Sequence, residues 1–360
     1  MAAVAAAGVV LAVPVPALAD PQVRCILDDP RLAEVSGLVE GPEGPQVVND
    51  SGNPSTVFRL DDDCAPVGLR AVPIDGRDVE DLARSADGTL WLADIGDNGR
   101  SRVSIAVLRI ATCVPSPAPR PRSAPCGSGG EAVTRLAYPD GAHDAESLLV
   151  PADARPVVVT KDLGGRSGVY VADEPAGEEP ALTPRPLRRA GEVVVPGEAL
   201  TSFGSGSFTG GAISADGRVV ALRTYTDAWL WAAPGGTATA EDVVAALRGV
   251  PVRVPLPGEV QGEALAFAPD GSLLSAGETP AGRESAALRV VPGAVGLVGG
   301  AASSASPAPV APAVAPAPDE TGSAGLPGPV LTLGAVLAGV VLVGALGALL
   351  ALLRRRGRRG

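Results

Sequence analysis

The 360-residue sequence predicts an all-β fold, a β-propeller of five or six four-stranded blades, followed by one C-terminal transmembrane helix. Three observations predict this organisation. Five segments repeat one pattern of apolar strand, tight turn and second apolar strand, and repeats spaced by several tens of residues are typical of propellers. Asp-Gly turns follow the first strand at Asp87, Asp216 and Asp270, which is a strong hairpin signal. An apolar run of membrane-spanning length lies near the C-terminus.

The two ends of the ectodomain are set by changes in composition. Residues 1–19 are almost purely Ala, Val, Leu and Pro and end in an Ala-Leu-Ala pattern, which predicts a secretory signal peptide. The alternative, a buried N-terminal helix, is disfavoured by two internal prolines. Residues 299–329 are rich in Ala, Pro, Ser and Gly, a composition typical of a semi-rigid stalk without a packed core. The folded ectodomain is therefore expected at residues 20–298.

The transmembrane helix is expected at residues 330–353, which hold only Val, Leu, Ala, Gly and one Thr. Five arginines follow at once in the basic tail, residues 354–360. Because positively charged flanks stay on the cytoplasmic side, the tail is expected in the cytoplasm. The sequence therefore predicts a single-pass protein of the cell membrane, with its N-terminal ectodomain outside.

Each repeated segment continues with a third strand and, in most cases, a fourth, and its β-branched residues favour strands over helices. One soluble helix is expected, at residues 239–247. Residues 23–27 are expected to supply the outer strand of the last blade, whose other strands end near Val291, and this closure would remove an open sheet edge. A β-sandwich is the alternative fold, but it does not explain an acidic residue at the same point of most units.

Four cysteines in an extracellular context predict disulfide bonds rather than a thiolate metal site. They are Cys25, Cys64, Cys113 and Cys126. Cys113 and Cys126 bracket a loop rich in Pro and Ser, which favours pairing them and leaves Cys25 with Cys64. The spacing does not exclude the other two pairings.

The acidic residues recur at a point that a propeller brings together. The first strand of each blade lines the central axis, so residues that open these strands meet at one axial mouth. This position holds Glu34, Glu80, Glu146, Thr209 and Glu263. The turns after the second strands reach the same face and supply Asn49, Asp50, Asp94, Asp97, Asn98 and Lys161, with Asp162, Thr224 and Glu278 beside them. No catalytic residue is assigned from the sequence.

This donor set suits a hard divalent cation. Calcium takes six to eight oxygen ligands from carboxylates, amides and carbonyls, and a cation would relieve the repulsion among clustered carboxylates. Lys161 is an alternative, built-in counter-charge. A third interpretation is that the acids cap loops through side-chain turns and hydrogen bonds between blades.

At these residues the sequence resembles secreted bacterial β-propellers of the "esterase-like activity of phytase" type, in a membrane-anchored, actinobacterial-like form. The resemblance covers about residues 24–291 and is most specific in "DVEDLA…ADIGDN", residues 78–98; "EVSGL", "NDSG", "ESL" and "GEAL" also match. It implies a propeller fold and is compatible with a calcium-assisted phosphoester or ester hydrolase. Thr209 stands where a complete acidic ring would carry a fourth-unit acid.

The formal net charge of −11 makes nucleic acid a poor partner. The preferred function is a cell-surface module that binds a ligand or a protein through its acidic, calcium-compatible face. The alternative is a calcium-dependent, phytase-like phosphoesterase or esterase, and a third possibility is a purely structural propeller. A Ser-His-Asp hydrolase is disfavoured, because the chain has no G-x-S-x-G elbow and His143 is its single histidine.

Overall fold

The computed structural model describes residues 19–298, except residues 73, 75, 111–130, 178, 203, 260 and 280–283. All described residues belong to one compact unit. They are mostly β-sheet, with the helix α1 (Ala240–Leu247), a helical segment at residues 294–298, and two short 3₁₀ helices, η1 (Pro30–Leu32) and η2 (Gly197–Ala199).

The strands form five four-stranded antiparallel units. Unit 1 comprises β2 (Val35–Gly41), β3 (Gly44–Asn49), β4 (Thr56–Leu60) and β5 (Pro66–Ala71). Unit 2 comprises β6 (Val79–Arg84), β7 (Leu90–Asp94), β8 (Ile105–Ile110) and β9 (Ala132–Ala137). Unit 3 comprises β10 (Ala145–Leu149), β11 (Val157–Thr160), β12 (Arg166–Ala172) and β13 (Ala181–Val194). Unit 4 comprises β14 (Phe208–Ile213), β15 (Val219–Thr224), β16 (Asp227–Ala232) and β17 (Val252–Pro255). Unit 5 comprises β18 (Gln261–Phe267), β19 (Leu273–Glu278), β20 (Ala287–Val291) and β1 (Gln22–Ile26).

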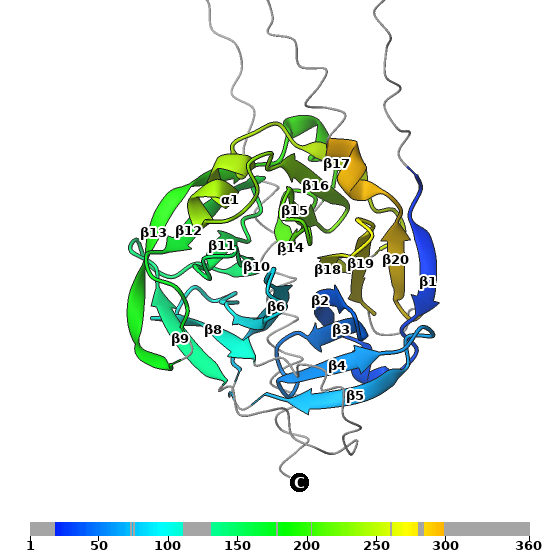
Figure 1. The fold of residues 1–360 in the computed structure, drawn as a ribbon, viewed down its shortest axis with the longest axis horizontal. Coiled ribbons are helices and arrows are strands. Elements are labelled where there is room, and N and C mark those ends of the chain that lie inside the picture. The colour runs from blue at the N-terminus through cyan, green and yellow to red at the C-terminus, as the bar shows by residue number, and fades with distance from the viewer. Residues whose placement is uncertain are drawn as a thin grey trace, which may run out of the picture. The chain divides into compact units, whose positions relative to one another are not determined.

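The units are arranged around a central axis as in a β-propeller, with the first strand of each unit innermost (Figure 1). The inner strands contact one another in chain order, β2 with β6, β6 with β10, β10 with β14 and β14 with β18, and β18 then contacts β2. Five hydrophobic clusters of buried side chains each lie between two adjacent units. Burial against both neighbours explains why inner strands such as β10 are fully buried, whereas the outer strand β5 alternates. The predicted propeller fold is confirmed.

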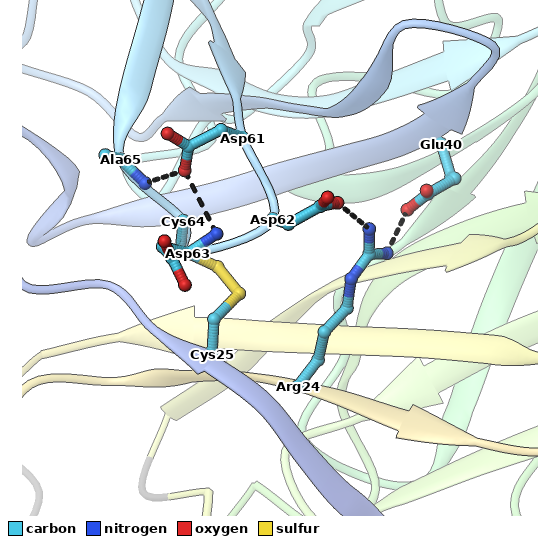
Figure 2. Close-up of a disulfide and its surroundings, with 8 residues drawn as sticks. All are labelled: Arg24, Cys25, Glu40, Asp61, Asp62, Asp63, Cys64 and Ala65. Atoms are coloured by element: carbon cyan, nitrogen blue, oxygen red, sulfur yellow. Dashed lines mark hydrogen bonds and ion pairs between the residues drawn. A yellow bond between two sulfur atoms is a disulfide. The ribbon is translucent and has the colours of Figure 1, made fainter.

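The N-terminal strand completes the last unit, as the sequence predicts. β1 pairs antiparallel with β20, so unit 5 combines strands from both ends of the folded region. Cys25 on β1 forms a disulfide with Cys64, which precedes β5 of unit 1, and Figure 2 shows this bond beside the pair that Arg24 forms with Glu40. The disulfide and the ion pair therefore fasten the closing strand to unit 1.

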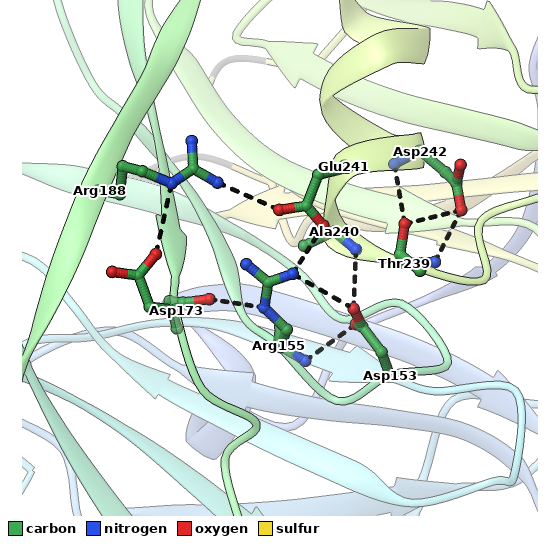
Figure 3. Close-up of polar contacts among 9 residues, drawn as sticks. Asp153, Arg155, Asp173, Arg188, Thr239, Ala240, Glu241 and Asp242 are labelled. Atoms are coloured by element: carbon green, nitrogen blue, oxygen red, sulfur yellow. Dashed lines mark hydrogen bonds and ion pairs between the residues drawn. The ribbon is translucent and has the colours of Figure 1, made fainter.

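Two further connections join neighbouring units. β13 of unit 3 pairs parallel with β9 of unit 2, so these units share one eight-stranded sheet. The helix α1 (Ala240–Leu247) of unit 4 begins at a capping box in which Thr239 and Asp242 bond each other's backbone N–H. Glu241 on its first turn accepts from Arg155 and Arg188 of unit 3, as Figure 3 shows. The helix predicted at residues 239–247 is thus present, with Thr239 as its N-cap.

Within residues 19–298, no described helix has the length and apolarity required to cross a bilayer. The predicted signal peptide (residues 1–18 of 1–19), stalk, transmembrane helix, basic tail, and Cys113 with Cys126 lie outside the described residues.

Candidate functional site

Each inner strand carries a β-bulge near its start, at the same point of every unit. In β6, Val79 pairs with Asp94 and Asp81 with Ala93, which leaves Glu80 unpaired. A bulge of this kind re-aims one side chain of the strand. The five unpaired residues, here called the bulge ring, are Ser36, Glu80, Glu146, Thr209 and Glu263.

The three carboxylates of the bulge ring converge on one mouth of the axis. Glu80 interacts electrostatically with both Glu146 and Glu263. The two hydroxyl members have other partners: Ser36 Oγ donates to the Glu80 carbonyl at 2.5 Å, and Thr209 Oγ1 donates to the Gly262 carbonyl at 2.9 Å. Those two bonds tie unit 1 to unit 2 and unit 4 to unit 5. The ring therefore combines three acids with two connecting hydroxyls.

A second set of residues, here called the rim, surrounds the bulge ring. Two residues before the bulges lie Glu34, Asp78, Asp144, Ser207 and Gln261, and at or just after the ends of the second strands lie Asp50, Ile95, Lys161, Tyr225 and Glu278. Asp50 and Asp78 of the rim and Glu80 of the ring each offer a carboxylate oxygen within 4.8 Å of the others. Oxygens on opposite sides of a bound Ca²⁺ are up to about 5 Å apart, so these three could share one ion.

The carboxylates of this mouth are buried and poorly paired. Glu80, Glu146 and Glu263 are 2 %, 3 % and 4 % exposed. Oε2 of Glu146 and Oε2 of Glu263 are buried and have no hydrogen-bond partner among the described residues. A buried carboxylate oxygen without a donor is costly. Both oxygens are therefore free to accept a cation or a donor from a ligand.

Burial and mutual repulsion raise the pKa values of these carboxyl groups. Burial raises the pKa of Glu146 to about 8 and that of Glu278 to about 7. Burial, with the Asp50 charge added, raises the pKa of Asp78 to about 6. The pKa values of Glu80 and Glu263 lie well above their usual range, because both are buried and face Glu146. A divalent cation would favour the ionised forms of all five.

Lys161 provides a positive charge among these acids. Its ammonium pairs with Glu146 Oε1 and lies 5.3 Å from the ring centroid of Tyr225. Burial acts to lower the pKa of Lys161, but the Glu146 carboxylate outweighs it, and the pKa lies above its ordinary value. Lys161 is therefore charged and only partly offsets the acidic mouth.

The predicted residues Asp94 and Asp97 support the mouth from behind. Buried Arg102 binds both carboxylate oxygens of Asp94 at 2.9 Å. Asp94 Oδ1 also accepts from the Asp78 backbone N–H at 2.9 Å, and Asp97 accepts from the Arg102 N–H at 2.7 Å. A methyl group at Gly96 would overlap Glu80 Oε1, so this loop packs directly against the acids. With its oxygens engaged by Arg102, Asp94 fixes the backbone of Asp78, and Asp97 fixes the loop that packs against Glu80.

Other predicted residues do not belong to the bulge ring. Glu34 is exposed and holds Asn53; its unit contributes Ser36 to the bulge ring instead. Asn98 is exposed, and Asn49 donates to the Arg31 carbonyl. Two arginines besides Arg102 lie near this face: Arg100 pairs with Asp162, and fully buried Arg223 pairs through Nη1 with Glu259. Nη2 of Arg223 is buried and has no hydrogen-bond partner among the described residues.

The axis is blocked below the bulge ring by Asp81. Its carboxylate accepts from the N–H groups of Leu82 and Leu148 at 2.8 Å and of Gly211 at 3.3 Å. These donors come from three different inner strands. A cavity of about 140 Å³ opens at the opposite end of the inner strands, lined by their hairpin turns. The acidic mouth is thus separated from that cavity.

Sequence reasoning missed Ser36, Asp78, Asp144 and Tyr225 as site residues because it aligned the repeats on their glutamates. The structure aligns "EVSGL" with "DVEDL" and "DAESL", so that Leu38, Leu82 and Leu148 correspond. An alignment of the repeats on these buried leucines, instead of on the glutamates, would have predicted the correct correspondence between units.

Comparisons with known proteins identify only distant structural likeness. No protein-family model matches the sequence, and no curated protein matches it. A virginiamycin B lyase from Staphylococcus aureus is similar at 12 % identity and a TM-score of 0.34, over 71 % of this chain and 67 % of that one. A gluconolactonase from Xanthomonas campestris is similar at 13 % identity and a TM-score of 0.38, over 72 % of this chain and 73 % of that one. A PQQ-bound aldose sugar dehydrogenase from Streptomyces coelicolor is similar at 14 % identity and a TM-score of 0.38, over 77 % of this chain and 99 % of that one. The propeller assignment itself rests on the sheet topology.

Proposed function

We propose that this chain is a membrane-anchored, five-bladed propeller that binds calcium at its acidic axial mouth and, through it, an extracellular ligand or protein. The observation that carries the proposal is the pair of buried, unpartnered oxygens, Oε2 of Glu146 and Oε2 of Glu263, beside the Asp50, Asp78 and Glu80 group. Native proteins seldom leave such acceptors unpaired. A bound cation would supply the missing partner.

The donor set favours calcium over softer or smaller ions. The acids of the mouth offer only oxygen, with neither His nor Cys among the bulge ring and rim residues, which suits a hard cation. Calcium also accepts an irregular set of six to eight oxygens, whereas magnesium requires near-ideal octahedral geometry. Five units contributing different residues form an irregular set of this kind.

The proposed anchoring follows from the sequence outside the described residues. An apolar segment at residues 330–353 with a basic tail would hold the chain in the membrane. The stalk at residues 299–329 would then present the propeller at the cell surface. Its acidic mouth would meet calcium at the millimolar level for which extracellular sites are suited.

A calcium-dependent hydrolase of phosphoesters is the second candidate, suggested by the sequence resemblance. Such an enzyme needs a metal-activated water and positive groups for the phosphate. Arg100 and Arg223 are paired with acids, and Lys161 is paired with Glu146. These pairings favour the binding module over the hydrolase.

Calcium titration of the full-length chain in detergent tests the proposal. After removal of metal with a chelator, we expect calcium to bind by calorimetry and to raise the melting temperature, because an ion bound only by the native state stabilises it. Glu263→Gln should weaken binding at least tenfold. Glu43→Gln, at an exposed hairpin position at the far end of β2, is the matched control and should bind as wild type does.

The same preparations separate the two candidates. Absence of calcium binding to the folded wild-type chain would contradict both. Binding without turnover of a model phosphoester such as 4-nitrophenyl phosphate supports the binding module. Turnover that is lost in a folded Glu80→Gln variant would establish the hydrolase instead.

A further inference from the structure

Lys161 is the single lysine of the chain, and it is placed inside the acidic mouth. It follows β11 directly, at the same point of unit 3 that Asp50 occupies in unit 1. Its backbone N–H donates to the Asp144 carbonyl at 2.9 Å, which fixes the start of the side chain. The side chain is 16 % exposed. The ammonium is therefore held at the mouth by its backbone, its carboxylate partner and the Tyr225 ring.

This one ammonium interacts with four of the carboxylates at the mouth. It pairs with Glu146, and its charge also lowers the pKa values of Asp50, Glu263 and Glu278. Those four groups come from three different units. Among the side chains that the structure describes at the bulge ring and rim, Lys161 is the one cation. It interacts with carboxylates that a bound metal ion would also contact.

We propose that the Lys161 ammonium is a tethered competitor for the cation site, which holds Glu146 in the metal-free state and releases it when a divalent cation binds. The inference rests on the proposed calcium function and adds to it the residue that sets affinity and selectivity. Glu146 can serve both states because Lys161 engages only Oε1, while Oε2 is unpartnered.

Tethering explains why the site would select divalent over monovalent cations. An ammonium fixed to the chain has a high effective concentration at its partner. A sodium or potassium ion brings the same single charge and loses freedom on binding, so it cannot displace the ammonium. A calcium ion brings twice the charge and could also bind oxygens that the Lys161 ammonium does not contact, those of the Asp50, Asp78 and Glu80 group.

Neutralising Lys161 tests the proposal by calorimetry on the full-length chain in detergent. Lys161→Met should bind calcium at least tenfold more tightly than wild type, and its affinity should fall when potassium is added. Lys161→Arg keeps the charge and should remain within about threefold of wild type. Arg100→Met is the matched control: it removes one charge on the same face, from an exposed pair with Asp162, and should change affinity less than twofold.

A second readout uses wild type alone, so it does not depend on a variant that folds. Labelling with ¹⁵N-lysine gives one side-chain ammonium resonance, because the chain has one lysine. Calcium should shift this resonance and speed its hydrogen exchange as the Glu146 contact breaks. If wild type binds calcium but the resonance stays unchanged, or if Lys161→Met binds within twofold of wild type, the Lys161 inference is overturned. If folded wild type binds no calcium, the proposed function fails first.

Discussion

A single side chain at each bulge decides what this propeller presents at its axis. The bulged residue is free of cross-strand pairing, so it can be acidic without disturbing the hydrophobic face of its strand. Its neighbours then determine its state. Glu80 lies beside Asp78 and against Gly96, whereas Ser36 and Thr209 bond backbone carbonyls of the next unit. The acidic bulge residues thus give the mouth its charge, whereas Ser36 and Thr209 connect neighbouring units.

Gly96 sets the space available to Glu80. In Gly96→Ala the new methyl would overlap Glu80 Oε1 and approach Asp78 Oδ2, so both carboxylates must shift. We expect calcium affinity to fall at least fivefold in calorimetry, and the unfolding free energy to fall by about 1–3 kcal/mol, because Glu80 is buried and the added methyl overpacks its surroundings. Gly99→Ala lies in the same loop, where the methyl meets only Ser101 Oγ at 3.7 Å. Equal calcium affinities for the two variants would contradict this role of Gly96.

The sequence predicts that acidic residues gather at the mouth, but it predicts only partly which residue of each unit lies in the bulge ring. Glu80, Glu146 and Glu263 follow from their place before apolar strands, and all three lie in the bulge ring. Glu34 does not, because it corresponds to Asp78, two residues before the bulge, and an alignment on the glutamates alone conceals that offset. The pairing of Arg102 with Asp94 joins residues eight apart across a loop, and the loop conformation that permits it has no sequence pattern.

At the level of elements, the closing strand β1 depends on its attachment to unit 1. Only β20 pairs with β1 in the sheet, so β1 is an edge strand held by one ladder and by the disulfide (Figure 2). The sequence predicts this closure because an unpaired strand near the N-terminus matches a missing strand in the last unit. The parallel pairing of β13 with β9 was not predictable, since an outer strand carries little apolar pattern.

Removing the disulfide measures what the closure contributes. The bond joins residues 39 apart, and restricting a loop of this length in the unfolded chain is worth about 4 kcal/mol. Cys25→Ser with Cys64→Ser should lower the unfolding free energy by about 2–4 kcal/mol in denaturant titration. Limited proteolysis should then cut first next to β1. If the double variant is as stable as the oxidised wild type, the disulfide does not secure the closing strand.

The capping box of α1 gives a second test at this scale. Thr239 Oγ1 accepts from the Asp242 N–H at 3.3 Å and donates to its carboxylate at 2.8 Å. Thr239→Ala removes the cap and should cost about 1 kcal/mol of unfolding free energy, measured by denaturant titration. Thr201→Ala, an exposed position outside any cap, should cost less than half of that. A smaller loss at Thr239 than at Thr201 would mean that contacts of Glu241 with unit 3 (Figure 3) alone hold the helix.

At the scale of the whole molecule, five units concentrate acids that one unit alone would leave in solvent. Their folded-state pKa values are raised by burial, from 4.5 to about 8 for Glu146, from 4.5 to about 7 for Glu278 and from 3.8 to about 6 for Asp78. Between the unfolded and folded values the native state binds more protons than the unfolded state. Stability is therefore greatest at the low end of this window and is lost as pH rises.

This linkage predicts how stability depends on pH with and without calcium. In chelator, the unfolding free energy should fall from about pH 5 to pH 8, with a slope of about 1.4 kcal/mol per pH unit for each proton lost. Acids with lowered pKa values, such as Asp29 at about 2, are ionised in both states throughout this range and do not oppose it. Saturating calcium should flatten the slope, because the ion replaces the protons. If the unfolding free energy in chelator increases from pH 5 to pH 8, the predicted pH dependence is wrong.

The recurrence of one bulge in every unit bears on how such a protein could diversify. Each bulged position lacks a cross-strand partner, so the three acidic ones could be exchanged one at a time while the strand pairing persisted. Such a propeller could acquire a different ligand preference by point substitution, without insertion of new loops.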